Sequence, residues 1–152
     1  MKLLSVFALA VLATGCASIT NDTSHPMKLE TLTKSGETVK GAECKLTNDY
    51  GVIPAKSGDT VMVRRSSKDL DINCVSAGQT DANGRAISRG NAGMAGNIIF
   101  GGGIGAIIDH NKGTAYTYPT WIQMVFGDTL IFDRREEKEG TPLKGAAPEA
   151  KK

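Results

Sequence analysis

The chain has 152 residues, a length typical of one domain, and a formal net charge of +2. This near balance gives no sign of the clustered basic face that binds nucleic acid, so no nucleic-acid partner is predicted. Aromatic residues make up only 5% of the chain and glycines number 18. That composition favours turns, short strands and close backbone packing over a large aromatic core.

The first fifteen residues have the pattern of a secretory signal peptide. Lys2 precedes an apolar run at residues 3–12, and small residues follow the run. The run is too short for a membrane-spanning helix, which needs about 20 residues, and it lacks the polar stripe of an amphipathic core helix. We therefore predict a signal peptide over residues 1–15.

The end of this segment, Ala13-Thr14-Gly15-Cys16, resembles the lipobox of bacterial lipoproteins. A thiol is required there because the lipid is joined as a thioether, and small residues fit the narrow site of the processing peptidase. The resemblance implies that Cys16 becomes the acylated first residue of the mature protein. Several acyl chains would anchor it firmly in a membrane, since each buried methylene adds about 0.8 kcal/mol.

The residue after the cysteine affects whether a lipoprotein stays in the inner membrane or is moved to the outer membrane. In lipoproteins of double-membraned bacteria, Asp at this place tends to retain the protein in the inner membrane. Here the residue is Ala17, which implies the outer membrane and leaves open which side the domain faces. The polar stretch that follows is rich in Thr and Ser and carries Pro26, so we predict a flexible, lipidated tether over residues 16–38 in which His25 is solvated.

A β domain is predicted over residues 39–132. Short strands separated by turn residues indicate a mainly β fold, a small antiparallel sandwich or meander. The first strands are expected at residues 43–47, 52–54, 60–64 and 69–75. Pro54 indicates an edge strand, and alternation in the third strand points Val63 inward and Met62 outward.

Two cysteines remain once Cys16 carries lipid. Period-two alternation points both Cys44 and Cys74 to the apolar side of their strands. In the oxidising compartment that export implies, we predict a disulfide between them. A metal site or a reactive thiol has no support, because no Cys-x-x-Cys occurs and neither histidine is close in sequence.

Two further turns are expected in the rest of the domain. Asn83-Gly84 is a common hairpin signal, with a returning strand over residues 85–88. Residues 120–126 alternate as a strand does, and residues 129–132 form the strand that follows. Gly127-Asp128 between them predicts a type II′ hairpin turn.

Residues 93–109 are apolar, contain six glycines and carry no charge before Asp109. Gly101 and Gly105 stand four apart and would give a helix one smooth face, for packing or as an interface. Internal packing on the domain's own sheet is favoured, with membrane contact or a protein interface as alternatives. The charged segment at residues 133–152 is predicted to be a disordered tail.

The domain is similar to the PEGA-type β domain of bacterial surface proteins and looks like a group of small proteobacterial outer-membrane lipoproteins of unassigned activity. The residues that carry the resemblance are Gly41-Ala42-Glu43-Cys44-Lys45-Leu46-Thr47-Asn48-Asp49, Val63-Arg64-Arg65-Ser66, Asp69-Leu70, Cys74, Gly96-Asn97-Ile98-Ile99-Phe100-Gly101-Gly102, Gly105, Asp109, Gly113-Thr114-Ala115 and Tyr118-Pro119. The resemblance implies a small β core with a glycine-rich insertion and no enzyme activity.

The favoured hypothesis is a non-enzymatic, lipid-anchored envelope lipoprotein with a structural or interaction role at the outer membrane. The alternative is an accessory or assembly lipoprotein of a secretion or transport complex, which docks an envelope protein through the glycine-rich segment. A hydrolase would need a nucleophile–base pair or paired carboxylates. Asp69, Asp71 and Asp109 are the candidate carboxylates, but Asp69 and Asp71 share a strand face away from the core and are expected to be solvated. No metal, cofactor or small-molecule substrate is predicted.

Overall fold

The computed structural model describes residues 23–90 and 115–149, and it confirms a mainly β fold. The strands in this part of the chain, with one short 3-10 helix, are β1 (Ser24–Leu32), β2 (Glu43–Asn48), β3 (Gly51–Lys56), β4 (Thr60–Arg64), β5 (Leu70–Val75), β6 (Ala82–Ala86), β7 (Arg89–Gly90), β8 (Tyr116–Thr117), β9 (Trp121–Val125), β10 (Thr129–Phe132), η1 (Arg134–Glu136) and β11 (Leu143–Lys144).

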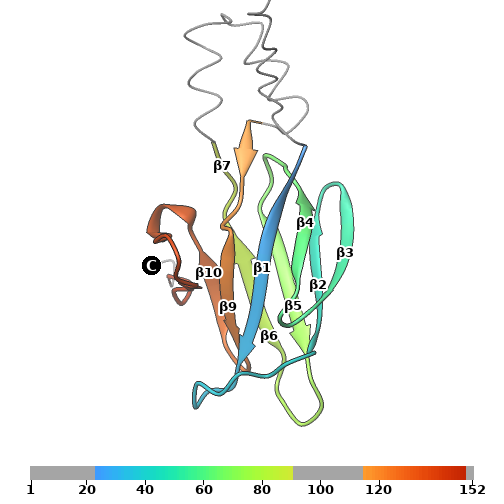
Figure 1. Cartoon of the computed structure of the whole chain (residues 1–152), viewed down its shortest axis with the longest axis vertical. Coiled ribbons are helices and arrows are strands. Elements are labelled where there is room, and N and C mark those ends of the chain that lie inside the picture. The colour runs from blue at the N-terminus through green and yellow to red at the C-terminus, as the bar shows by residue number, and fades with distance from the viewer. Residues whose placement is uncertain (1–22, 91–114, 150–152) are drawn as a thin grey trace, which may run out of the picture.

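The longer strands form a sandwich of two sheets (Figure 1). One sheet has the order β11-β9-β1-β4 and the other has the order β10-β6-β5-β2-β3. Their inner faces share one core, in which Met27, Leu29 and Ile122 of the first sheet join Leu46 and Ile72 of the second. The strand pair β7-β8 lies at one end of the sandwich.

The sheets are mixed, whereas the sequence predicted antiparallel pairing. Antiparallel ladders join β2 to β3 and β5, β5 to β6, and β1 to β4. The pairs β1–β9, β6–β10 and β9–β11 are parallel. In none of the three parallel pairs are the two strands consecutive in the chain.

Alternation located several strands well. β4 has the predicted bounds, with Val63 fully buried and Met62 58% exposed. β3 is an edge strand of its sheet, as Pro54 indicated. A second backbone donor of β3 is also occupied, because the Lys56 amide donates to the Asp59 carboxylate at 3.1 Å. These two features leave few free donors on that edge, which discourages pairing with other chains.

The hairpin predicted at Asn83-Gly84 is wrong, because both residues lie inside β6. Gly84 is buried, and an ideal Cβ atom on it would lie 2.7 Å from Sδ of Met124 in the opposite sheet and 3.0 Å from Cε2 of Phe132 in its own sheet. The glycine therefore permits close approach of the two sheets and does not form a turn. The chain reverses earlier, around Gly78, whose φ is 74°.

The predicted hairpin at Gly127-Asp128 is also wrong. A turn is present, since the Asp128 amide donates to the Val125 carbonyl at 3.1 Å and Gly127 has a φ of 79°. Gly127 is thus the third residue of the turn, as in type II, and is not the first central residue of a type II′ turn. The turn carries the chain from one sheet to the other, because β9 and β10 belong to different sheets.

Both boundaries of the domain extend beyond the predicted 39–132. β1 lies within the predicted tether and is a central strand of its sheet, and His25 on it is 4% exposed instead of solvated. At the other end, the predicted tail contains η1 and β11, and Leu143 is buried. Composition misled in both places, because a polar stretch can supply a strand whose alternate residues are apolar.

Candidate functional site

The predicted disulfide between Cys44 and Cys74 is confirmed. The two residues are directly opposite each other on the neighbouring strands β2 and β5, with Cα atoms 4.0 Å apart, and both are buried. The bond joins two central strands of the five-stranded sheet, and Cys44 also borders a hollow on the outer face of that sheet. Cys16, the predicted lipid attachment residue, lies outside the described residues.

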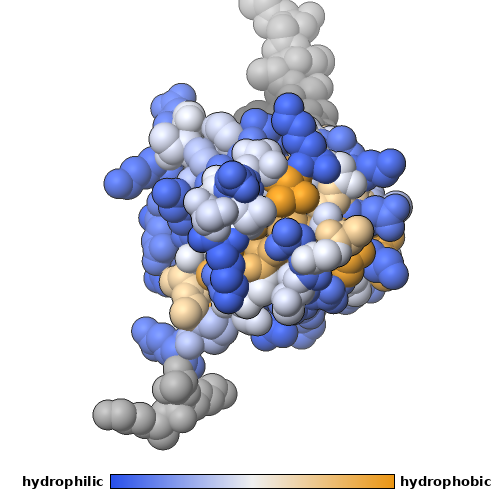
Figure 2. Space-filling view, turned by 90° about the horizontal axis from the view of Figure 1, so that it is seen from below, coloured by the Kyte–Doolittle hydropathy of each residue, from blue (hydrophilic) through white to orange (hydrophobic). Residues whose placement is uncertain are grey.

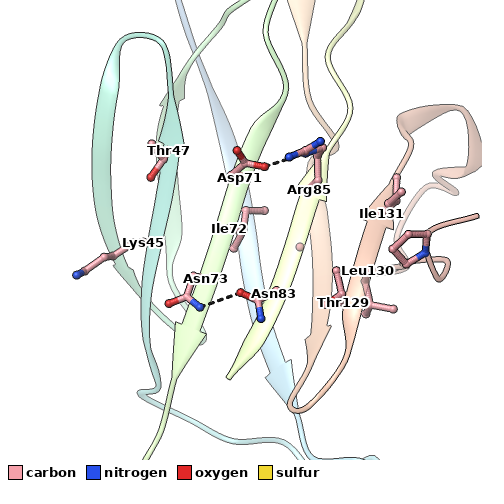
Figure 3. A pocket seen from close by; sticks show the side chains of 12 residues that line it. Lys45, Thr47, Asp71, Ile72, Asn73, Asn83, Arg85, Thr129, Leu130 and Ile131 are labelled. Atoms are coloured by element: carbon pink, nitrogen blue, oxygen red, sulfur yellow. Dashed lines mark hydrogen bonds and ion pairs between the residues drawn. The ribbon is translucent and has the colours of Figure 1, made fainter. Parts of the chain in front are cut away.

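The outer face of the five-stranded sheet carries a patch of polar side chains, which we call the polar face (Figure 3). Strand register arranges them in two rows, because alternate residues of each strand point outward. One row has Thr47, Asp71 and Arg85; the other has Lys45, Asn73, Asn83 and Thr129.

Cross-strand contacts hold most of these side chains in place. Arg85 Nε donates to Asp71 Oδ1 at 2.8 Å, and the pKa of Arg85 is raised, chiefly by this hydrogen bond. Asn73 Nδ2 donates to Asn83 Oδ1 at 3.0 Å. Lys45 has no ion pair with any described residue.

Between the two rows lies a hollow of about 540 Å³. Ile72 and Gly84 lie at its floor, and Leu130, Ile131 and Pro148 form an apolar border. A second hollow of about 520 Å³ shares Lys45 and Asn73 with the first, and Pro54 and Val75 line it further along the sheet. Such a surface offers hydrogen-bond donors and acceptors to a partner, but it contains no nucleophile beside a base.

His25 is the histidine within the described residues, and it is not positioned as the base of a hydrolase. It lies on β1, in the other sheet, and its Nε2 is 3.3 Å from the Pro119 carbonyl oxygen. Burial and, to a smaller extent, the nearby charge of Arg65 together lower the pKa of His25 from 6.5 to about 4. The imidazole is therefore neutral at pH 7 and contributes to the packing of β1.

The carboxylates that sequence analysis considered are engaged in structural contacts. Asp69 Oδ1 accepts a hydrogen bond from the Ser88 amide at 3.0 Å, and Asp71 pairs with Arg85. Asp109 lies outside the described residues. Over residues 23–90 and 115–149 no cluster of three or more His, Cys, Asp or Glu side chains could hold a metal ion.

The residues that border the undescribed segments meet at one end of the sandwich (Figure 1). The Arg65 amide donates to the Thr23 carbonyl at 2.8 Å, and Arg65 Nη1 donates to the Tyr116 carbonyl at 3.0 Å. Gly90 is opposite Tyr116 in the β7–β8 pair. Thr23, Gly90 and Tyr116 thus lie around Arg65; we call this region the Arg65 end.

The sequence reasoning did not find either surface. The polar face brings together residues from four strands, and only the strand register reveals that they are neighbours. Gly101 and Gly105, which were predicted to form a packing or interface surface, lie outside the described residues. Their segment begins directly after Gly90, at the Arg65 end.

Comparisons with known proteins add no relative. No protein-family model, curated protein or solved structure matches this chain. In the part of the chain that the structure describes, no helix has the length and apolar character needed to cross a membrane. The similarity to a PEGA-type lipoprotein domain stays a prediction from the residues that carry it.

Proposed function

We propose that this chain is a non-enzymatic lipoprotein of the outer membrane, held there by lipid on Cys16, with a structural or interaction role. The observation that carries the proposal is the meeting of Thr23, Gly90 and Tyr116 at the Arg65 end. Cys16 precedes Thr23 by seven positions, so a lipid on it would lie within about 25 Å of this end.

The most apolar segment of the mature chain is connected to the same end. Residues 93–109 begin three positions after Gly90 and end six positions before Ala115, where the described chain resumes. A lipid on Cys16 and this segment would therefore both be next to one surface of the domain. A domain that stands on a membrane is expected to collect its apolar attachments at one end in this way.

The disulfide supports an extracytoplasmic location. Disulfides form and persist in oxidising compartments and are rare in the cytosol. The Cys44–Cys74 bond joins residues with a sequence separation of 30 and is fully enclosed by the sandwich, as a stable structural crosslink should be. Export through the predicted signal peptide would bring the chain to such a compartment.

A Cys16→Ser variant tests the anchor. Expressed in a double-membraned bacterium, the wild-type chain should float with outer-membrane vesicles and show the mass of attached acyl chains by intact-protein mass spectrometry. The variant should lack the added mass and leave the membrane fraction. Ala17→Ser serves as a control that keeps both properties, whereas Ala17→Asp should redirect the lipidated chain to the inner membrane. A Cys16→Ser chain that stays in the membrane fraction would contradict the proposal.

A further inference from the structure

The Arg65 end exposes an aromatic side chain stacked with a cation. Tyr50 lies in the turn between β2 and β3, and its side chain is 43% exposed. The Arg64 guanidinium carbon lies 4.1 Å from the centre of the Tyr50 ring. Arg64 ends β4 opposite Ser24, the first residue of β1, which places the stacked pair beside the segment that leads back to Cys16.

Two contacts fix the backbone beneath this pair. Asn48 Nδ2 donates to the Arg64 carbonyl at 2.9 Å, and Asn48 Oδ1 accepts from the Tyr50 amide at 2.9 Å. One asparagine side chain thus connects the β2–β3 turn to the edge of the opposite sheet. The Tyr50 ring and the Arg64 guanidinium are therefore presented on an ordered support.

The charges at this end leave two cations without carboxylate partners. Arg64 and Lys68 make no ion pair within the described residues, and both are exposed. The two nearby carboxylates have other partners: Asp49 accepts from the Ser66 hydroxyl, and Asp69 accepts from the Ser88 amide. Among the described residues of this end, Arg64 and Lys68 are exposed cations that can contact an anionic surface.

From these observations, and resting on the proposed lipid anchor, we propose that Tyr50, Val52, Arg64 and Lys68 contact the headgroups of a bilayer that contains anionic phospholipid. We call these four residues the headgroup surface. Tyrosine is enriched at membrane–water interfaces, and Lys and Arg side chains close to an anionic bilayer are attracted to it. Val52, two positions after Tyr50 and 60% exposed, adds an apolar side chain.

A bilayer is proposed as the partner because the predicted lipid on Cys16 is close to this end in the sequence. Seven positions separate Thr23 from the predicted lipid, so the headgroup surface would be held close to the bilayer whenever the chain is anchored. The strands would then stand away from the membrane, with β1 running outward. At the opposite end of the sandwich, hydrophilic side chains surround a smaller hydrophobic area (Figure 2), and the exposed Lys34 is paired with Asp128 at 3.7 Å.

The depth of single tryptophans in vesicles tests this arrangement. The lipidated full chain carries one tryptophan, Trp121, which is replaced by phenylalanine to give a silent background. Tyr50→Trp and Gln79→Trp then place a reporter at either end, since Gln79 is exposed in the loop between β5 and β6. Vesicles of phosphatidylethanolamine and phosphatidylglycerol contain brominated acyl chains as quenchers. We expect Tyr50→Trp to lose fluorescence and Gln79→Trp to keep it.

A charge variant tests the same surface with Trp121→Phe and Tyr50→Trp in place. Arg64→Gln/Lys68→Gln should reduce the quenching, whereas the matched pair Lys34→Gln/Lys56→Gln should not. Flotation of the vesicles reports the anchor independently. If all chains float but the two reporter positions are quenched equally, the headgroup surface is wrong while the anchor stands. If the lipid-dependent flotation itself is missing, the proposed function fails.

Discussion

Gly84 of β6 lies directly against the side chain of Met124 in β9, so the two sheets are in contact at a position where one side chain is missing. An ideal Cβ atom on Gly84 would lie 2.7 Å from Met124 Sδ and 2.9 Å from Met124 Cε. Both residues are buried. We expect Gly84→Ala to lower the free energy of unfolding by about 1–3 kcal/mol, the usual cost of overpacking a core. Urea denaturation followed by circular dichroism measures this loss.

Two further variants identify the cause of that loss. Asn83→Ala changes the neighbouring residue, which points outward, and should cost much less. Met124→Ala opens space beside Gly84, so Gly84→Ala should cost less in its presence than alone. Equal costs in both backgrounds would show that the Met124 contact is not the reason for glycine.

The disulfide predicts a large effect of reduction. Cys44 and Cys74 close a loop with a sequence separation of 30, so chain entropy assigns the bond roughly 3–4 kcal/mol. In a Cys44→Ala/Cys74→Ala variant the free energy of unfolding should be lower by this amount, so the variant should unfold at a lower urea concentration. Dithiothreitol should have no further effect on the variant. If wild type and variant unfolded together without reductant, the crosslink would contribute nothing.

His25 predicts a loss of stability in mild acid. Burial, followed by the charge of Arg65, lowers the pKa of His25 from 6.5 to about 4, although the Pro119 carbonyl partly opposes this. The unfolded chain therefore takes up a proton below about pH 6.5, while the folded chain resists until about pH 4. Stability falls across this window, by about 3 kcal/mol at most.

Denaturation at pH 7 and pH 4.5 checks the histidine's share. His25→Gln cannot take up the proton, so its stability should change less than that of wild type between these two values. The positive charge of Arg134 and the carboxylate of Glu137 also act on His25, and neither is altered by the variant. An equal loss in both proteins would assign the acid sensitivity to other groups.

Asp133 predicts a loss of stability in stronger acid, through a carboxylate and not through an imidazole. Arg89 donates to both carboxylate oxygens, at 3.2 and 2.5 Å, and Arg135 adds further bonds, so the pKa of Asp133 lies well below its ordinary value. Because Arg89 is more than a third exposed, its ion pair with Asp133 is worth only about 1 kcal/mol. Asp133→Asn should lose that amount at pH 7. The difference should shrink below the ordinary pKa of the carboxyl group, because the unfolded wild-type chain then takes up a proton that the folded chain resists.

The sequence predicted strands where alternation was clean and misjudged them where composition was polar. β4 was located because apolar and polar residues alternate in it. β1 has the same alternation, with Met27, Leu29 and Thr31 inward, but Ser, Thr and Pro nearby indicated a linker. Weighing period over composition would have found it. Gly84 could not have been understood from sequence, because its role depends on a side chain forty positions away.

The candidate surfaces were less accessible to sequence reasoning than the core. The Cys44–Cys74 bond followed from counting cysteines and from strand faces, since both are local properties. Asn73 and Asn83 of the polar face come together only through the β5–β6 register. Arg65 joins Thr23 to Tyr116 across the ends of three separate segments. No spacing in the sequence encodes such contacts.

The C-terminal segment supplies the last prediction, because its charge suggested a tail and its structure is ordered. Leu143 of β11 is opposite Ile122 of β9 and only 5% exposed. Two residues later, Gly145 passes so close to β10 that an ideal Cβ would lie 2.7 Å from Leu130 Cβ. The segment therefore packs on the sandwich at Leu143, against β9, and at Gly145, against β10.

We expect Leu143→Ala to lower the free energy of unfolding by about 2–3 kcal/mol, as for other buried leucines. Lys144→Ala, at the exposed neighbouring position, should cost little and serves as the control. Hydrogen exchange adds a local measure: the Ile131 amide bonds to the Ala146 carbonyl at 2.8 Å and should lose protection in Leu143→Ala. A solvated tail would give no change in either quantity, because a leucine without neighbours loses nothing when it is shortened.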